Sequence, residues 1–160
     1  MRGVAIVLSC IGVFGAPGLA QPRHPIYLQY DGFVRNLDSS LTLAFGYYNL
    51  NQVDVSIEPG ADNRFLTGAG DRKQPALFLA GRHRFACVMV VPRDFDGGLQ
   101  WQVSFAGQTS TTTARMMDPR YALEEASALR VVEGFDPAGA PAGVCIDTGK
   151  DGRNSQGGVR

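Results

Sequence analysis

Residues 41–47 read LTLAFGY, and this stretch alternates large apolar side chains with small ones. Successive side chains of a β-strand point to opposite faces, so an alternating stretch has one large face and one small face. The large face holds Leu41, Leu43, Phe45 and Tyr47, and the small face holds Thr42, Ala44 and Gly46. The period of two predicts a strand whose large face belongs to a hydrophobic core.

The same alternation recurs along the chain and predicts about seven short strands. Residues 85–91 are apolar on both faces, which is typical of a central strand covered on both sides. Further strands are expected at residues 26–30, 53–57, 76–79, 99–105 and 109–115. The pattern favours an all-β fold, a single antiparallel β-sandwich over residues 21–133.

The connections between these strands are rich in Gly, Pro, Asp and Asn. We expect a turn at residues 94–98, a long exposed loop at 63–75 and one short helix at 122–129. Residues 134–160 form a Gly/Pro-rich C-terminal segment with little to bury, which predicts a mobile tail.

The composition agrees with this class of fold. Of 160 residues, 44% are hydrophobic and 19% are charged, while Gly numbers 20 and Pro 9. These proportions exclude wholesale disorder and a coiled coil. Basic and acidic residues number 15 each, so the charge balance points neither to nucleic acid nor to an anionic membrane.

The first twenty residues have the features of a secretory signal peptide. Arg2 precedes an apolar stretch at residues 4–14, and residues 18–20 (GLA) supply small residues before a cleavage site. We expect cleavage before Gln21 and a periplasmic or secreted protein with no remaining transmembrane segment. A retained anchor is the alternative, although the apolar stretch is shorter than the roughly 20 residues that span a bilayer. Lipid attachment at Cys10 is disfavoured because few apolar residues precede it.

Removal of the leader leaves two cysteines, Cys87 and Cys145, in an oxidising compartment. They predict one disulfide, which would tie the C-terminal segment to the sandwich. Closing a loop of nearly sixty residues would stabilise the fold by about 4 kcal/mol in the chain-entropy estimate. The alternative is two unpaired thiols, one in a buried strand and one in a loose loop.

Trp101 lies between the two cysteines, fourteen residues after Cys87. In immunoglobulin domains a tryptophan packs on a disulfide that joins the two sheets, so this spacing favours an immunoglobulin-like sandwich. Two features weaken the comparison. Gly143 stands where the tyrosine corner would be, and the residues before Cys145 are rich in Pro and Gly.

Nine short motifs run from Tyr30 to about Leu123. They are YDGF (30–33) with Asn36, FGYYNLN (45–51), DNRF (62–65), QP (74–75), GRHRF (81–85), VPRDF (91–95), Trp101, GQT (107–109) and DPRY (118–121). In order and spacing this pattern resembles a family of small exported bacterial proteins of uncharacterised function. The resemblance implies export but no substrate, cofactor or catalytic residue. Cys87 replaces the apolar residue typical of its position, so the disulfide is expected to be particular to this chain.

The residue types needed for catalysis are sparse. A Ser/His/Asp triad would have to use His83, because His24 lies beside the expected new N-terminus. Arg82 and Arg84 flank His83, and their like charge would depress the basicity that a general base needs. A strand-edge hydrogen-bonding role is favoured for this histidine.

Metal ligands are also scattered. Two histidines 59 positions apart offer no zinc cluster. Two acidic groupings, Asp94 with Asp96 and Asp62 with Asn63 and Asp71, match no calcium loop. They are interpreted as solvated turn residues, and no cofactor is expected.

A basic patch is the first candidate binding surface. Its members would be Arg64, Arg72, Lys73, Arg82 and Arg84, if the 63–75 loop folds beside the strand that contains His83. Such a patch could receive an acidic partner or polysaccharide. The alternative, which is favoured, is a solvated face whose charges are partnered by nearby acids.

An aromatic surface is the second candidate. Its members would be Tyr27, Tyr30, Phe33 and Tyr48, with Asn49 and Asn51 nearby. Tyr47 and Tyr48 must point to opposite faces of a regular strand, so one ring is left near solvent. An exposed tyrosine beside asparagines suits sugar or protein contact, although a ring that closes the end of the sandwich is the commoner case.

These features predict an exported, non-catalytic binding module whose partner is a protein or polysaccharide of the cell envelope. A structural accessory subunit that docks through a sheet edge such as residues 109–115 is the first alternative. A small hydrolase or metalloenzyme is the second.

Overall fold

The computed structural model describes residues 24–95, 98–112, 118–123 and 137–146. The expected leader, Cys10, residues 113–115, most of the expected helix at 122–129 and the end of the tail lie outside these ranges. The described residues form an all-β fold with eight strands and one 3-10 helix, as the alternating pattern predicted.

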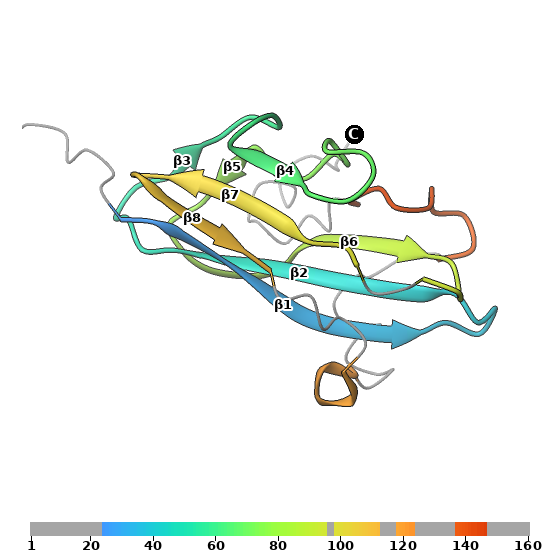
Figure 1. Ribbon diagram of the computed structural model, residues 1–160. Helices are drawn as coiled ribbons and strands as arrows, with labels where there is room; N and C mark the ends of the chain where they lie inside the picture. Colours follow the sequence, from blue (N-terminus) through green and yellow to red (C-terminus); the bar gives the residue numbers. More distant parts are fainter. Residues whose placement is uncertain (1–23, 96–97, 113–117, 124–136, 147–160) are drawn as a thin grey trace, which may run out of the picture.

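The strands form three antiparallel sheets (Figure 1). The large sheet has the order β1-β2-β6, with β1 at Ile26–Arg35, β2 at Leu41–Asn49 and β6 at Gly81–Val91. The small sheet has the order β4-β7-β8, with β4 at Asn63–Phe65, β7 at Trp101–Phe105 and β8 at Gln108–Thr111. A two-stranded ribbon pairs β3 at Val55–Ser56 with β5 at Leu77–Phe78. The helix η1 spans Pro119–Tyr121.

The core lies between the large and small sheets. Leu43, Phe45 and Tyr47 are buried, as the period of two in β2 predicted. Trp101 from the small sheet is fully buried, and its ring meets the ring of Phe45 edge-on at 6.4 Å between centroids. The two sheets therefore meet through interlocking aromatic rings.

The predicted double-sided burial of residues 85–91 is confirmed for the second half of β6. Cys87 and Met89 are buried on the core side, and Val88 and Val90 are buried on the opposite side. Beside this half of the sheet, the Leu123 N–H donates to the Phe33 carbonyl at 2.8 Å. The large sheet therefore has one half with both faces covered.

Two β-bulges interrupt the large sheet at the same level. Tyr30 pairs with Phe45, but Gly32 pairs with Ala44, so Asp31 is an extra residue in β1. In β6, three residues (84–86) lie between the positions that pair with Tyr47 and Phe45. The β1 bulge changes which residues of its strand face the core, whereas the two extra residues in β6 leave His83 and Cys87 on the same side.

Several connections differ from the sequence-based expectations. The 63–75 stretch is not simply an exposed loop, because it contains β4, and Asn63, Phe65 and Gln74 are buried. Asn63 and Gln74 are polar, and their burial is tolerated because their side-chain amides are hydrogen-bonded. The turn at 94–98 does not join neighbouring strands, because β6 and β7 belong to different sheets.

The edges of the large sheet are partly covered by other parts of the chain. Along β6, Val88 pairs with Ile146 and Val90 pairs with Ala142. Along β1, the Leu28 N–H donates to the Ser110 hydroxyl of β8 at 2.8 Å, and the two strands lie side by side (Figure 1). Residues 142–146 are thus an edge segment of the sandwich and no loose tail.

Candidate functional site

The predicted disulfide is present between Cys87 and Cys145, whose Cα atoms lie 4.9 Å apart. It joins β6 to the segment that pairs with the edge of β6, and so it connects neighbours in one sheet. The disulfide of an immunoglobulin domain joins two sheets instead. The sandwich is shown, whereas the immunoglobulin-like arrangement stays a prediction.

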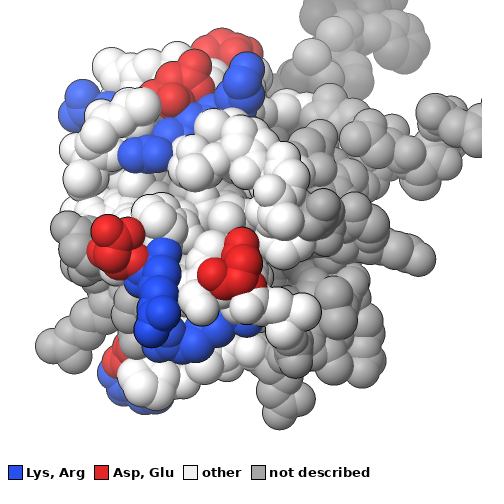
Figure 2. Space-filling view, turned by 90° about the vertical axis from the view of Figure 1, so that its right-hand side faces the viewer, with Lys and Arg blue, Asp and Glu red and all other residues white. Residues whose placement is uncertain are grey.

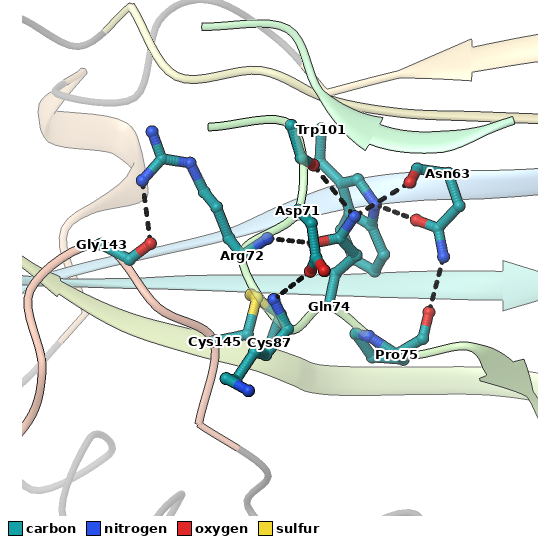
Figure 3. The surroundings of a disulfide bond; sticks show 11 residues. Asn63, Asp71, Arg72, Gln74, Pro75, Cys87, Trp101, Gly143 and Cys145 are labelled. Carbon is teal, nitrogen blue, oxygen red and sulfur yellow. Dashed lines mark hydrogen bonds between the residues drawn. A yellow bond between two sulfur atoms is a disulfide. The ribbon is translucent and has the colours of Figure 1, made fainter. Parts of the chain in front are cut away.

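Arg72 fastens the same C-terminal segment from the other side (Figure 3). Its guanidinium donates to the carbonyls of Gly143 at 2.8 Å and Thr67 at 2.9 Å, and it lies over the Phe65 ring. The Arg72 carbonyl accepts from the Cys145 N–H at 2.7 Å. Partial burial lowers the pKa of Arg72 from its ordinary value. This residue of the predicted basic patch is used inside the fold.

A buried amide network holds the small sheet against the loops (Figure 3). Asn63 accepts from the Trp101 indole N–H at 2.8 Å and donates to the carbonyls of Ile57 and Pro75. Gln74 donates to the Asn63 carbonyl at 2.9 Å. Asn63 therefore fixes the position of Trp101 and has no surface left for a metal or a ligand.

Asp31 makes the least ordinary contact of the large sheet. Its side chain is only 3% exposed, although it is charged. It crosses above Gly46 of β2 to accept from the Arg84 Nε at 3.1 Å and from the Phe85 N–H at 2.7 Å. Burial raises the pKa of Asp31, although the bonds to Phe85 and Arg84 oppose that shift. The two bulges are thus clasped together across the central strand.

The predicted basic patch is divided by these contacts. Arg72 binds carbonyls, Arg84 is paired with Asp31, and Arg64 lies on β4 opposite Gln102 of β7. Lys73 follows in the loop, where its N–H donates to Asp71. Figure 2 shows the end of the molecule that is on the right in Figure 1, and there basic side chains alternate with acidic ones.

The predicted aromatic surface is also divided. Tyr30 and Phe33 are not exposed: both are buried in the core, so their assignment to a surface is wrong. Tyr30 follows the alternation that also buries Ile26 and Leu28, and the extra residue at Asp31 turns Phe33 toward the same side. Tyr27 and Tyr48 do lie at the surface, 45% and 39% exposed.

The register of the large sheet brings Tyr27 and Tyr48 together with one member of the basic set. Tyr27 pairs with Tyr48, and Tyr48 pairs with Arg82. Directly opposed residues of antiparallel strands share a face, so these three side chains form one row on the outer face. Gln29 and Arg84 lie beside the row, on either side of Gly46. We call this surface the tyrosine–arginine shelf: Tyr27, Gln29, Tyr48, Arg82 and Arg84.

His83 is held by contacts within the fold. Its ring stacks on the buried Tyr47 ring at 5.0 Å, and its Nε2 lies 3.1 Å from the Ala80 carbonyl. In the described part of the chain, no three His, Cys, Asp or Glu side chains are grouped so that they could hold a metal ion. Within the same residues, no helix has the length and apolar character needed to cross a membrane.

No family model matches the chain, and neither the curated proteins nor the solved structures contain a match.

Proposed function

We propose that this chain is an exported, non-catalytic binding module that presents the tyrosine–arginine shelf to a component of the cell envelope. The observation that carries the proposal is the row formed by Tyr27, Tyr48 and Arg82 across three adjacent strands. Exposed tyrosines and arginines are the side chains that contribute most often to recognition surfaces.

The sheet beneath the shelf supports this role because it is held rigid from several sides. The Asp31 contacts clasp β1 to β6, and the Ser110 hydroxyl accepts from the backbone of β1. A surface that does not rearrange loses little conformational entropy when a partner binds. The proposal places the protein in the periplasm or outside the cell, with its leader removed.

The test compares variants for what they retain from a solubilised envelope fraction. Tyr48→Ala and Arg82→Gln each remove one side chain from the shelf without touching the core. Leu66→Ala is the control, because Leu66 is 43% exposed and lies next to the small sheet. We expect both shelf variants to lose the retained material and the control to keep it. Equal retention by all three would exclude the shelf as the contact surface.

A further inference from the structure

We infer, on the basis of the proposed function, that the tyrosine–arginine shelf binds an acidic polysaccharide whose sugar rings carry carboxylates. The tyrosine rings would lie against the sugar rings, and Arg82 would pair with a carboxylate.

The charges on the shelf favour an anionic ligand. Arg82 makes no ion pair with any described residue, and its side chain is exposed. Arg84 is 49% exposed, donates its Nε–H to Asp31, and lies with its guanidinium over the Phe85 ring, 4.6 Å from the ring centroid. Asp31 lies beside the shelf, and its carboxylate is buried and already bonded. A guanidinium is planar and presents paired donors that match a carboxylate.

The geometry of the row favours a sugar chain. Neighbouring strands lie about 4.8 Å apart, so the row from Tyr27 to Arg82 spans roughly 10 Å, which is close to the length of two linked sugar rings. A tyrosine offers an apolar ring face with a hydroxyl at its tip, and a sugar ring likewise has an apolar face and a rim of hydroxyls. Gln29 adds an amide that can donate to or accept from those hydroxyls.

Two other anionic polymers fit the shelf less well. An extended peptide is usually recognised by a free strand edge or a groove, whereas this row lies across the face of a sheet. A nucleic acid carries one charge per phosphate and is usually bound by a wide basic surface. Here the basic and acidic residues of the chain are equal in number.

The experiment measures binding of four defined probes to the mature protein by calorimetry. The probes are an oligogalacturonate, a neutral galacto-oligosaccharide of equal length, hexaglutamate and oligothymidylate. We expect the oligogalacturonate to bind and the other three to bind at least about tenfold more weakly. Added salt should weaken the interaction, because the ion pair with Arg82 is exposed to solvent.

Variants connect the binding to the shelf. Arg82→Gln should weaken oligogalacturonate binding about tenfold or more, because a charge-assisted hydrogen bond is lost. Tyr48→Ala should weaken it as well, whereas Tyr48→Phe should keep the contribution of the ring. Arg64→Gln is the charge-matched control, because it removes the same charge from β4 of the other sheet, and it should leave binding unchanged.

The outcomes distinguish the inferred sugar ligand from the proposed binding module. Stronger binding of hexaglutamate or oligothymidylate, lost in the shelf variants, would overturn the sugar assignment and keep the binding module. If none of the four probes binds, while the shelf variants still lose the envelope material, the sugar assignment also fails and the module stands. If Arg64→Gln weakens binding as much as Arg82→Gln, the interaction is unspecific attraction and the inference is wrong.

Discussion

At the scale of single residues, the clasp between Asp31 and the β6 bulge explains two otherwise unrelated features. Gly46 is the residue above which the carboxylate passes, and a Cβ there would lie 2.5 Å from both the Asp31 Oδ2 and the His83 carbonyl oxygen. Phe85 takes a positive φ of 60°, which is uncommon for a residue with a side chain. The Asp31 carboxylate accepts from that strained residue's N–H and so holds it in place.

The steric requirement at Gly46 gives a direct prediction. Gly46→Ala should destabilise the protein by about 1–3 kcal/mol, because one of the two close neighbours is backbone and cannot rotate away. Gly60→Ala is the matched control, since its nearest neighbour would be the Glu58 carbonyl at 3.9 Å. Urea unfolding of both variants measures the difference. Similar urea midpoints for the two variants would mean that Asp31 and the His83 backbone move away from residue 46 easily.

The pKa of Asp31 gives a second prediction, about pH. Burial raises the pKa of Asp31 in the folded protein above the ordinary value of 3.8. A raised pKa means that the folded state binds the proton more tightly, so this contribution to stability is present below about pH 3.8 and is lost as pH rises through the folded pKa. Asp31→Asn cannot titrate.

The measurement is the free energy of unfolding of the wild-type protein and of Asp31→Asn, from pH 3 to neutral pH. We expect the wild type to lose stability relative to the variant as pH rises. The other carboxylates titrate in both proteins and cancel in the difference. If the free energy of unfolding of the wild type instead rises relative to that of the variant as pH rises, the pairing with Arg84 stabilises the ionised carboxylate by more than burial destabilises it.

At the scale of strands, the bulges also show what the sequence can and cannot predict. The large face of β2 is buried, as the period of two predicts, but Thr42, Ala44 and Gly46 of the small face are buried as well, and Tyr48 is the exposed residue of this strand. In β1 the alternation breaks at Asp31, so the period of two does not give the face on which Phe33 lies. A bulge depends on contacts with other strands, and here Asp31 needs Arg84, more than fifty positions later. Local periodicity carries no information about such a partner.

The candidate site, too, could be predicted from the sequence only in part. The exposure of one tyrosine from the pair at 47 and 48 followed from strand geometry. The row formed by Tyr27, Tyr48 and Arg82 did not, because it depends on the register between three strands. The disulfide was predictable from the two cysteines that remain once the expected leader is removed, but its place at the edge of β6 was not.

The edge segment gives a prediction at this scale. The amides of Gly143 and Ile146 donate to the Val90 and Val88 carbonyls at 2.7 and 2.8 Å. The disulfide closes a separation of 58 residues, so Cys145→Ser should cost about 4 kcal/mol in the chain-entropy estimate. The melting temperature should fall, and it should no longer respond to reductant.

Hydrogen exchange followed by mass spectrometry shows whether the segment is released. In Cys145→Ser, peptides that cover 142–146 should exchange faster, while peptides from β2 should keep their protection. Equal melting of the wild type with and without reductant would contradict the stabilising role of the disulfide.

At the scale of the whole molecule, the large sheet has two unlike ends. One end has both faces covered, and the other presents the tyrosine–arginine shelf on its outer face. The clasp at Asp31 lies at the boundary between the two. The sandwich thereby separates the residues that stabilise it from the residues that it exposes.

The proposed export gives a prediction for the intact protein. The protein recovered from its native envelope should lack the mass of residues 1–20, and both thiols should resist alkylation until the disulfide is reduced. Intact mass spectrometry with and without reductant measures both properties at once. A full-length mass with freely alkylated thiols would contradict both the leader and the oxidising compartment.

The disulfide has a further consequence for mechanical force. A pull on the chain beyond Cys145 passes through the sulfur bridge into β6, and from β6 into its hydrogen bonds with β2. The covalent loop from 87 to 145 contains β7, β8 and η1, and it carries none of that tension until the bridge is reduced. If the C-terminal end is the point of attachment in the envelope, β7 and β8 are shielded from load, and the strength of the module is set by shearing β6 from β2.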